Sequence, residues 1–108
     1  MIEQLIRLQE LYDLYEGLLT PKQREYFELY YHEDLSLAEI ADQLQISRNA
    51  VHDNIKRTEK ALENYEAKLG SHQDRQKRRQ LLRQLRSCQL DGQSAPLVAA
   101  LFDLDDLE

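Results

Sequence analysis

Apolar residues recur at intervals of three and four along most of the chain, and no alternating strand pattern lasts for long. This periodicity is typical of amphipathic helices, and only 3 Gly and 2 Pro interrupt it. The helices that it predicts cover residues 2–16, 21–31, 37–44, 48–69, 72–90 and 96–104. We therefore predict an all-α fold without a sheet.

The first two predicted helices have apolar faces and recognisable boundaries. Gly17 suits the C-terminal stop of the first helix, and Thr20 with Gln23 has the pattern of a capping box that opens the second. The first helix carries a broad apolar arc, made of Ile2, Leu5, Leu8, Tyr12 and Tyr15. The second helix carries four aromatic residues that we expect mostly in the core, namely Tyr26, Phe27, Tyr30 and Tyr31.

The stretch SLAEIADQLQISRNAVHDNIKR, residues 36–57, has the pattern of a helix-turn-helix. Ser36 and Glu39 can cap the first of its helices, and Ser47 can cap the second. Ile46 can fill the corner between them. Gln45 stands at the turn position where glycine is often preferred, so we expect a left-handed backbone there with a small strain.

Polar residues at the start of the second helix of this motif project away from its apolar stripe, where a recognition helix meets a major groove. The candidate nucleic-acid contacts on this face are Ser47, Arg48, Asn49, His52 and Lys56. Asp53 shares the face, and its carboxylate would repel phosphates. It could instead accept a hydrogen bond from a cytosine amino group or hold Arg57 one turn away.

The same helix continues well beyond the motif, because its apolar seam keeps a spacing of four and three. The seam consists of Val51, Ile55, Thr58, Leu62, Tyr65 and Leu69. A seam of this length requires a partner helix. The first helix, the helix over residues 72–90 or a second subunit could each provide it.

The charge of the chain is distributed unevenly. The net charge is -6, with ten acidic and three basic residues in residues 1–46. Residues 72–90 instead carry six basic and one acidic residue, and residues 91–108 carry five acidic and no basic residues. We expect one domain over 1–108, with a helix-turn-helix core at 19–69. Residues 72–108 would add a basic helix, a short last helix and an acidic tail.

Four arginines of the basic helix fall within one narrow stripe on a helical wheel, opposite a face with Leu81, Leu82, Leu85 and Cys88. The stripe consists of Arg75, Arg79, Arg83 and Arg86. It could follow a phosphate backbone or meet an acidic protein surface. Alternatively, these arginines pair with acidic residues of the same chain, each pair contributing about 0 to 1 kcal/mol.

The chain offers no residue set with the spacing of a catalytic, metal or cofactor site. Its three histidines, His32, His52 and His72, lie in different segments, Cys88 is the single cysteine, and no glycine-rich phosphate loop follows a strand. No signal peptide or membrane-spanning apolar run follows Met1. We expect a cytoplasmic protein that is not an enzyme, binds no cofactor and has no membrane partner.

Residues 19–57, LTPKQREYFELYYHEDLSLAEIADQLQISRNAVHDNIKR, resemble region 4 of bacterial sigma factors, whose helix-turn-helix reads promoter DNA. This resemblance implies nucleic-acid contacts by the five candidates named above and structural roles for Val51 and Ile55. Asp53 departs from the basic or neutral residue that is common there in sigma factors.

A longer resemblance is to the YlxM family of Gram-positive bacteria. It runs from the first helix through LYYHEDLSLAEIA and ISRNAVHDNIKRTEKALENYEAKL to the basic helix. That family is encoded beside the GTPase of the signal recognition particle. It is regarded as a helix-turn-helix regulator or accessory protein of the signal recognition particle pathway.

The resemblance leads us to expect a non-catalytic accessory protein of that pathway, which binds the particle's RNA or its GTPase, with the arginine stripe as a contact. Two alternatives remain open. The chain could be a DNA-binding transcription regulator that uses residues 47–56, or a helical interaction module that forms a homodimer through its helical seams.

Overall fold

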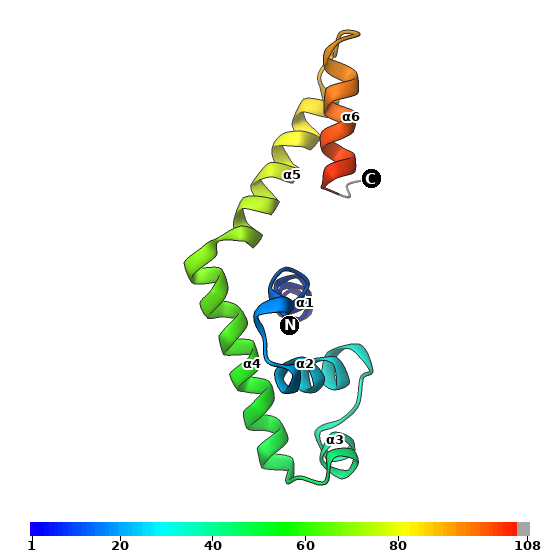
Figure 1. Ribbon diagram of the computed structural model, residues 1–108. Coiled ribbons are helices and arrows are strands. Elements are labelled where there is room, and N and C mark those ends of the chain that lie inside the picture. The colour runs from blue at the N-terminus through cyan, green and yellow to red at the C-terminus, as the bar shows by residue number, and fades with distance from the viewer. Residues whose placement is uncertain (106–108) are drawn as a thin grey trace. The chain divides into compact units, whose positions relative to one another are not determined.

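The computed structural model describes residues 1–105, which are helical apart from short connections (Figure 1). The α-helices are α1 (Ile2–Tyr15), α2 (Pro21–Phe27), α3 (Leu37–Leu44), α4 (Arg48–Leu69), α5 (Ser71–Ser87) and α6 (Ser94–Leu104). A 3-10 turn, Glu16–Leu18, follows α1, and a π-helical turn, Glu28–His32, extends α2. No strand occurs within the described range, so the predicted all-α fold is confirmed.

The chain divides into two compact units, with the boundary after Gly70. The first unit holds α1 to α4 and the second holds α5 and α6. The expectation of a single domain stays a prediction. The last residues of the predicted acidic tail, 106–108, lie outside the described residues.

Side-chain caps start the helices of the first unit where the sequence predicts them. Ser36 Oγ accepts a hydrogen bond from the Glu39 backbone N–H at 3.1 Å, and Glu39 Oε1 accepts one from the Ser36 N–H at 2.9 Å. The bond from this N–H holds the pKa of the Glu39 carboxyl below its usual value. Thr20 and Gln23 form the same reciprocal capping box around Pro21. Both predicted capping boxes are therefore confirmed.

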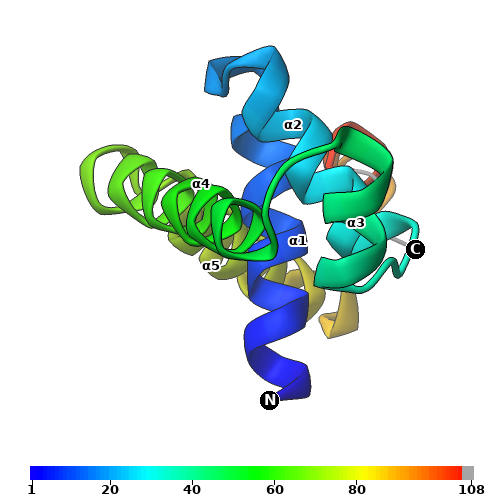
Figure 2. The same ribbon diagram turned by 90° about the horizontal axis from the view of Figure 1, so that it is seen from below.

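Two adjoining clusters form the core of the first unit. The first lies where α1 crosses α4 at a steep angle, with α2 alongside (Figure 2). There the ring of Tyr12 stacks on Phe27 with 4.3 Å between centroids. Its buried residues are Leu8, Leu11, Tyr12, Tyr15, Leu19, Phe27 and Leu62. The second cluster joins α3 to the start of α4 and consists of Tyr26, Leu29, Ile40, Val51 and Ile55.

The apolar seam of α4 finds its partners within the first unit. Leu62 packs in the cluster that α1 and α2 supply, and Thr58 is also fully enclosed. Two carboxylates flank the seam, where Tyr15 donates to Glu66 Oε1 and Tyr31 donates to Glu59 Oε2, each at 2.6 Å. Of the three partners that the sequence left open, α1 covers the seam at Leu62, while Val51 and Ile55 pack in the second core cluster. Leu69, at the end of the predicted seam, is 55% exposed, and a second subunit stays a prediction.

The apolar face of α1 is shorter than its sequence pattern predicts. Leu8 and the buried residues after it face α4, whereas Ile2 and Leu5 are exposed. The α-helix ends at Tyr15, and the 3-10 turn begins at Glu16, one residue before Gly17. The predicted arc is therefore wrong at Ile2 and Leu5. The helix ends one residue earlier than predicted, with Glu16 as its C-cap.

In the second unit, α5 and α6 form an antiparallel hairpin around Leu82, Val98 and Phe102. Asp91 Oδ1 accepts from the backbone N–H groups of Gln93 and Ser94, at 2.9 and 2.7 Å, and so starts α6. The hydrogen bonds from Ser94 keep the pKa of the Asp91 carboxyl below its usual value.

The predicted apolar face of α5 is wrong in part. Leu82 is buried against α6, but Leu81, Leu85 and Cys88 are exposed. These three residues lie about 100° away from Leu82 around the helix, on a side that α6 does not cover. Among the described residues, no helix is both long enough and apolar enough to cross a membrane.

We predict that Leu62→Ala lowers the free energy of unfolding by about 2–5 kcal/mol, because the lost methyl groups leave a cavity in an enclosed site. Leu69→Ala, in the same helix but 55% exposed, is the matched control and should change it by less than about 0.5 kcal/mol. Urea unfolding followed by circular dichroism measures both. Equal decreases in the free energy of unfolding of the two variants would contradict the packing described above.

We also predict opposite effects of glycine at two neighbouring positions. Gln45→Gly should be more stable than Gln45→Ala by about 1 kcal/mol. Both variants lose the bond from Gln45 Nε2 to Asp42 O, but only alanine is strained at φ 57°. At Gln43, inside α3, the alanine variant should instead be more stable than the glycine variant by about the same amount. Thermal unfolding of the four variants measures whether the stability difference between glycine and alanine has opposite signs at the two positions.

Candidate nucleic-acid interface

The turn between α3 and α4 sets the direction in which the candidate residues project. Gln45 has a left-handed conformation, with φ 57° and ψ 46°, as its position in the sequence predicts. The Ile46 N–H then donates to Ala41 O at 3.1 Å, while the side chain of Ile46 packs against the second core cluster. Ser47 follows as the N-cap of α4, and its Oγ accepts from the Ala50 N–H at 3.1 Å.

The first turns of α4 present an exposed polar face. Its members are Ser47, Arg48, Asn49, His52, Asp53 and Lys56, and we call it the α4 polar face. The side chains of Arg48 and Asn49 make no hydrogen bond or ion pair with any residue of the described range. Their donors are therefore available for a ligand, whereas the hydroxyl oxygen of Ser47 is already used as a cap. The structure thus brings the five predicted contacts of this helix onto one surface.

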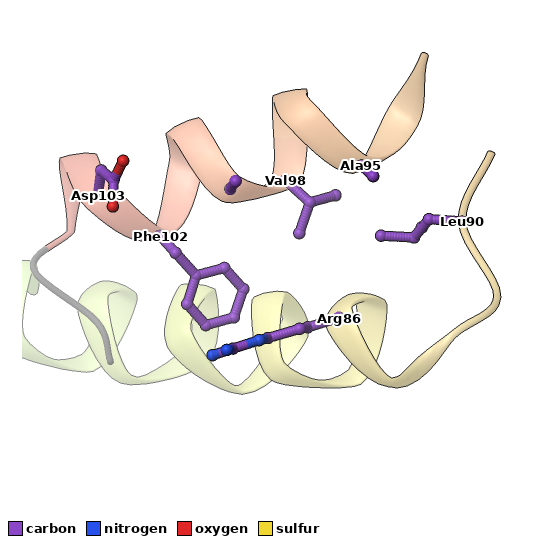
Figure 3. Close-up of a pocket in the computed structure, with 7 residues that line it drawn as sticks. Arg86, Leu90, Ala95, Val98, Phe102 and Asp103 are labelled. Atoms are coloured by element: carbon purple, nitrogen blue, oxygen red, sulfur yellow. The ribbon is translucent and has the colours of Figure 1, made fainter. Parts of the chain in front are cut away.

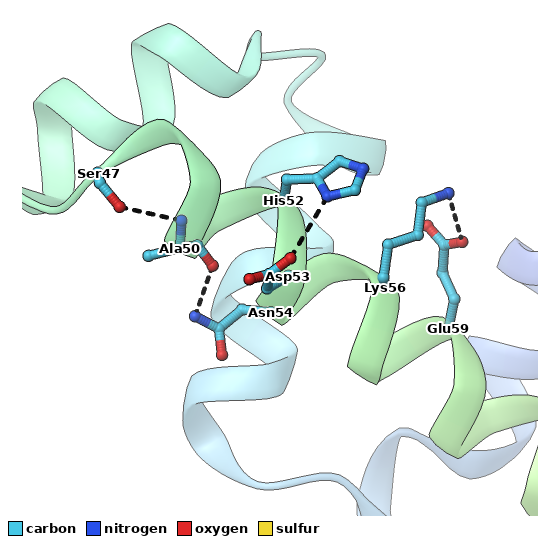
Figure 4. A network of polar contacts seen from close by, with 7 residues as sticks. All are labelled: Ser47, Ala50, His52, Asp53, Asn54, Lys56 and Glu59. Atoms are coloured by element: carbon cyan, nitrogen blue, oxygen red, sulfur yellow. Dashed lines mark hydrogen bonds and ion pairs between the residues drawn. The ribbon is translucent and has the colours of Figure 1, made fainter.

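Two acidic residues modify the charge of this face (Figure 4). His52 Nδ1 lies 3.6 Å from Asp53 Oδ1, which is an ion pair only when the imidazole is protonated. Lys56 Nζ lies 3.5 Å from Glu59 Oε1, and the other oxygen of Glu59 accepts from the Tyr31 hydroxyl. Glu59 is thus fixed by Tyr31 and its side chain is 17% exposed, whereas the side chain of Lys56 is 62% exposed.

Arg57 and Lys60 are also exposed on α4, and the sequence analysis did not include them among the contacts. Asp53 lies next to His52 and forms no ion pair with Arg57, so the guanidinium of Arg57 is not neutralised by that carboxylate. Helical spacing could have found both residues, because Arg57 follows Asp53 by four positions and Lys60 follows Lys56 by four.

The predicted arginine stripe of α5 lies toward α6, which changes the roles of its members. The Arg86 guanidinium sits 5.0 Å from the centre of the Phe102 ring (Figure 3). Arg79 Nη2 donates to Asp105 O at 3.2 Å, and the neighbouring Arg78 Nε donates to Asp105 Oδ2 at 2.6 Å. The Arg78 guanidinium lowers the pKa of the Asp105 carboxyl. The basic side of α5 therefore contributes contacts within the hairpin.

The remaining two arginines of the stripe differ in exposure. The Arg83 side chain is exposed and makes no hydrogen bond or ion pair with the described part of the chain, whereas Arg75 is half-buried. Pairing with the acidic C-terminal segment thus occurs at Arg79, and the neighbouring Arg78 adds an ion pair that the sequence analysis missed. Arg83 is therefore the exposed member of the stripe whose guanidinium has no partner among the described residues.

A cavity of about 250 Å³ opens between α5 and α6 beside the Arg86 side chain (Figure 3). Its walls are mainly apolar, and the residues that line it are Arg86, Leu90, Ala95, Val98, Ala99, Phe102 and Asp103. The lining includes one guanidinium and one carboxylate, and it includes no nucleophile. Within residues 1–105, no three His, Cys, Asp or Glu side chains converge as a metal site would require.

We predict that Arg78→Gln raises the pKa of the Asp105 carboxyl toward its usual value, because the charged hydrogen bond is lost. Arg83→Gln, which removes the same charge from an exposed position, should leave that pKa unchanged. The contribution of the wild-type pair to the hairpin is present while Asp105 is ionised, and it is lost as the pH falls through the lowered pKa. Carboxyl-carbon NMR titration measures all three proteins.

Comparison with known proteins identifies the family to which this chain belongs. The family model UPF0122, described as "Putative helix-turn-helix protein, YlxM / p13 like", matches residues 2–98. The UPF0122 protein of Geobacillus sp. (strain WCH70) is 51% identical over the full length of both chains. That of Geobacillus kaustophilus is 48% identical, also over both full lengths. That of Anoxybacillus flavithermus is 54% identical over 81% of this chain and 79% of its own. The chain therefore belongs to the UPF0122 family of YlxM/p13-like helix-turn-helix proteins.

Proposed function

We propose that the chain is a non-catalytic accessory or regulatory protein of the signal recognition particle pathway, and that it binds the RNA of the particle. The YlxM resemblance supports the pathway, and the α4 polar face supports the chemistry. The observation that carries the proposal is that Arg48 and Asn49 are exposed and without partners among residues 1–105, at the first turn of a helix-turn-helix second helix.

The cations of α4 suit a phosphate backbone. The guanidinium of Arg48 can form two parallel hydrogen bonds with one phosphate group, and Lys56 and Lys60 extend the positive charge along the same side of the helix. Each phosphate that such a residue neutralises releases bound counterions, so the affinity falls as the salt concentration rises. Asp53 opposes this attraction locally, which favours a small number of defined contacts over a continuous basic surface.

Within the second unit, we propose Arg83 as the main RNA contact of the stripe, with Arg75 as a weaker one. Arg79 and Arg86 would first have to leave Asp105 and Phe102, and that exchange reduces any gain from binding. We therefore propose RNA contacts for Arg83 and Arg75, and not for Arg79 and Arg86.

A second candidate function, reading of double-stranded DNA, is favoured by the helix-turn-helix itself. The major groove of B-form DNA admits a helix, whereas that of A-form RNA is too deep and narrow for side chains to read. In this version Asn49 would recognise an adenine edge and Arg48 a guanine edge or a phosphate. Binding of the GTPase of the particle is the remaining possibility under the same pathway.

The experiment compares binding of the particle RNA, an unrelated RNA hairpin of equal length and a pool of duplex DNA by fluorescence anisotropy at several salt concentrations. We expect the particle RNA to bind most tightly. Arg48→Ala/Lys56→Ala should weaken that binding at least about 10-fold and reduce the slope of log affinity against log salt by about 1.5. Lys22→Ala/Lys68→Ala removes the same charge from exposed sites away from the α4 polar face and should change little.

Different outcomes separate the candidates. Tightest binding to a selected DNA sequence, with relaxed selection in Asn49→Ala, would replace the RNA proposal by the DNA one. Binding of the GTPase with no affinity for any nucleic acid would refute both nucleic-acid versions. Equal losses of RNA affinity in the two double variants would show that binding depends on net charge alone. That result would overturn the assignment of the site to the α4 polar face.

A further inference from the structure

The first two turns of α1 expose an apolar surface in the first unit. Ile2, Leu5 and Ile6 are exposed at 72%, 40% and 51%. Their spacing of i, i+3 and i+4 places them on one side of the helix, next to the side on which Leu8 packs in the first core cluster. Figure 2 shows this end of α1 projecting away from α2. Much of the apolar area of these three side chains therefore remains in contact with solvent.

A groove continues this surface onto neighbouring segments of the same unit. It has a volume of about 410 Å³ and lies between α1 and the segment that joins the π-helical turn to α3. Leu5 lines it from α1, and Tyr30 and Leu35 line it from the other side. Tyr30 and Leu35 also pack against the second core cluster, so the core holds this side of the groove in place. We call the groove, together with Ile2 and Ile6, the α1 groove.

The rim of the α1 groove is acidic. Among the described residues that line the groove, Asp34 and Glu39 are acidic and none is basic. The Asp34 side chain makes no hydrogen bond or ion pair with residues 1–105. Glu39 uses one carboxylate oxygen in its capping box, which leaves the other oxygen for a ligand. On the α1 side, Glu3 is exposed three positions before Ile6, so a carboxylate also borders the apolar surface there.

We propose that the α1 groove binds a basic amphipathic helix of a partner protein. An apolar surface with a charged rim is typical of an interaction site, and here the charges that select the partner lie in the lining itself. Lysine or arginine side chains of the partner would pair with Asp34 and Glu39 at the edge, while apolar side chains would cover Leu5.

The same carboxylates disfavour the other classes of partner. They would repel the phosphates of a nucleic acid and the headgroups of an anionic membrane. A second copy of this chain, placed with its own α1 groove on this one, would bring two acidic rims together, and like charges repel. A positively charged protein segment is thus the partner that the charge of this surface favours.

A helix suits the shape of the surface. Ile2, Leu5 and Ile6 form a ridge of the kind that packs between the side chains of a second helix. The partner helix would place apolar residues at i, i+3 or i+4, and i+7 against this ridge and against Leu35, with basic residues on both sides of them. The α1 groove shares no residue with the α4 polar face, so this inference does not depend on the proposal that the chain binds RNA.

The experiment measures binding of labelled peptides to the full chain by fluorescence anisotropy, without nucleic acid. The probe is a helical peptide of about 18 residues, or five turns, with leucine on one face and lysine on the other. We expect it to bind at least about 10-fold more tightly than two matched peptides. One has glutamate in place of every lysine, and the other has the same composition in a scrambled order that places its leucines on no common face.

The acidic rim is tested by removing its charge without changing its shape. Asp34→Asn/Glu39→Gln should weaken binding of the lysine peptide at least about 5-fold. Asparagine suits the positive φ of Asp34, and glutamine can keep the hydrogen bond from the Ser36 N–H. Glu16→Gln/Glu25→Gln removes the same charge from exposed positions outside the α1 groove and should change the affinity little.

The apolar ridge is tested in the same way. Ile2→Gln/Leu5→Gln should weaken binding at least about 10-fold, because less apolar area is removed from water in the complex. Glutamine is a good helix former, so α1 should persist. Leu18→Gln/Leu69→Gln changes two other exposed leucines of the first unit and should retain the wild-type affinity. Absence of binding, equal binding of the scrambled peptide, or equal losses in the groove and control variants would each overturn the proposal.

A second measurement uses the wild type alone and so does not depend on the folding of any variant. In amide NMR spectra, the lysine peptide should shift mainly the signals of residues 2–6 and 30–39. Shifts concentrated on the α4 polar face or in the second unit would overturn the assignment of the site. Shifts of residues 2–6 and 30–39 on raising the protein concentration without peptide would show that a second copy occupies the groove, and would overturn the proposal as well.

Discussion

The enclosure of the α4 seam by α1 and α2 is the contact on which the first unit depends. Leu62 lies between these helices without solvent exposure, and the Tyr12–Phe27 stack closes the same cluster. Three tyrosines add hydrogen bonds to carboxylates around this core, from Tyr12, Tyr15 and Tyr31 to Glu28, Glu66 and Glu59. Because α4 continues from its buried middle to its exposed first turns, packing at Leu62 also positions the α4 polar face.

Four glutamates of the first unit have a structural use. Burial raises the pKa of the Tyr12 and Tyr31 hydroxyls, which disfavours their ionised form, and each protonated hydroxyl needs an acceptor close to the core. Glutamates on neighbouring helices supply it. Glu63 serves in a different way, because it accepts two hydrogen bonds from Arg7, at 2.7 and 3.0 Å, and so connects α4 to α1 at its edge. These four carboxylates therefore help to hold the helices of the first unit together.

Local signals in the sequence predicted the helix starts, the left-handed Gln45 and the exposed first turns of α4, because caps and periodicity depend on neighbouring residues. They did not predict which side of α5 is covered. A helical wheel places Arg79, Arg86 and Leu82 on adjoining positions, but the surface that α6 covers is decided by a partner remote in sequence. For the same reason, the periodicity of α1 could not indicate that Ile2 and Leu5 lie beyond the helices that cover Leu8.

The turn at Gln45 has a consequence for recognising such motifs. Its left-handed backbone is accommodated without glycine, because the Gln45 side chain donates to Asp42 O at 2.7 Å and Ile46 inserts next to it into the core. The corner is thus stabilised by a side-chain amide and by a partly buried isoleucine. A search pattern that demands glycine at this corner would miss this helix-turn-helix, whereas one built on the two serine caps and the intervening isoleucine would find it.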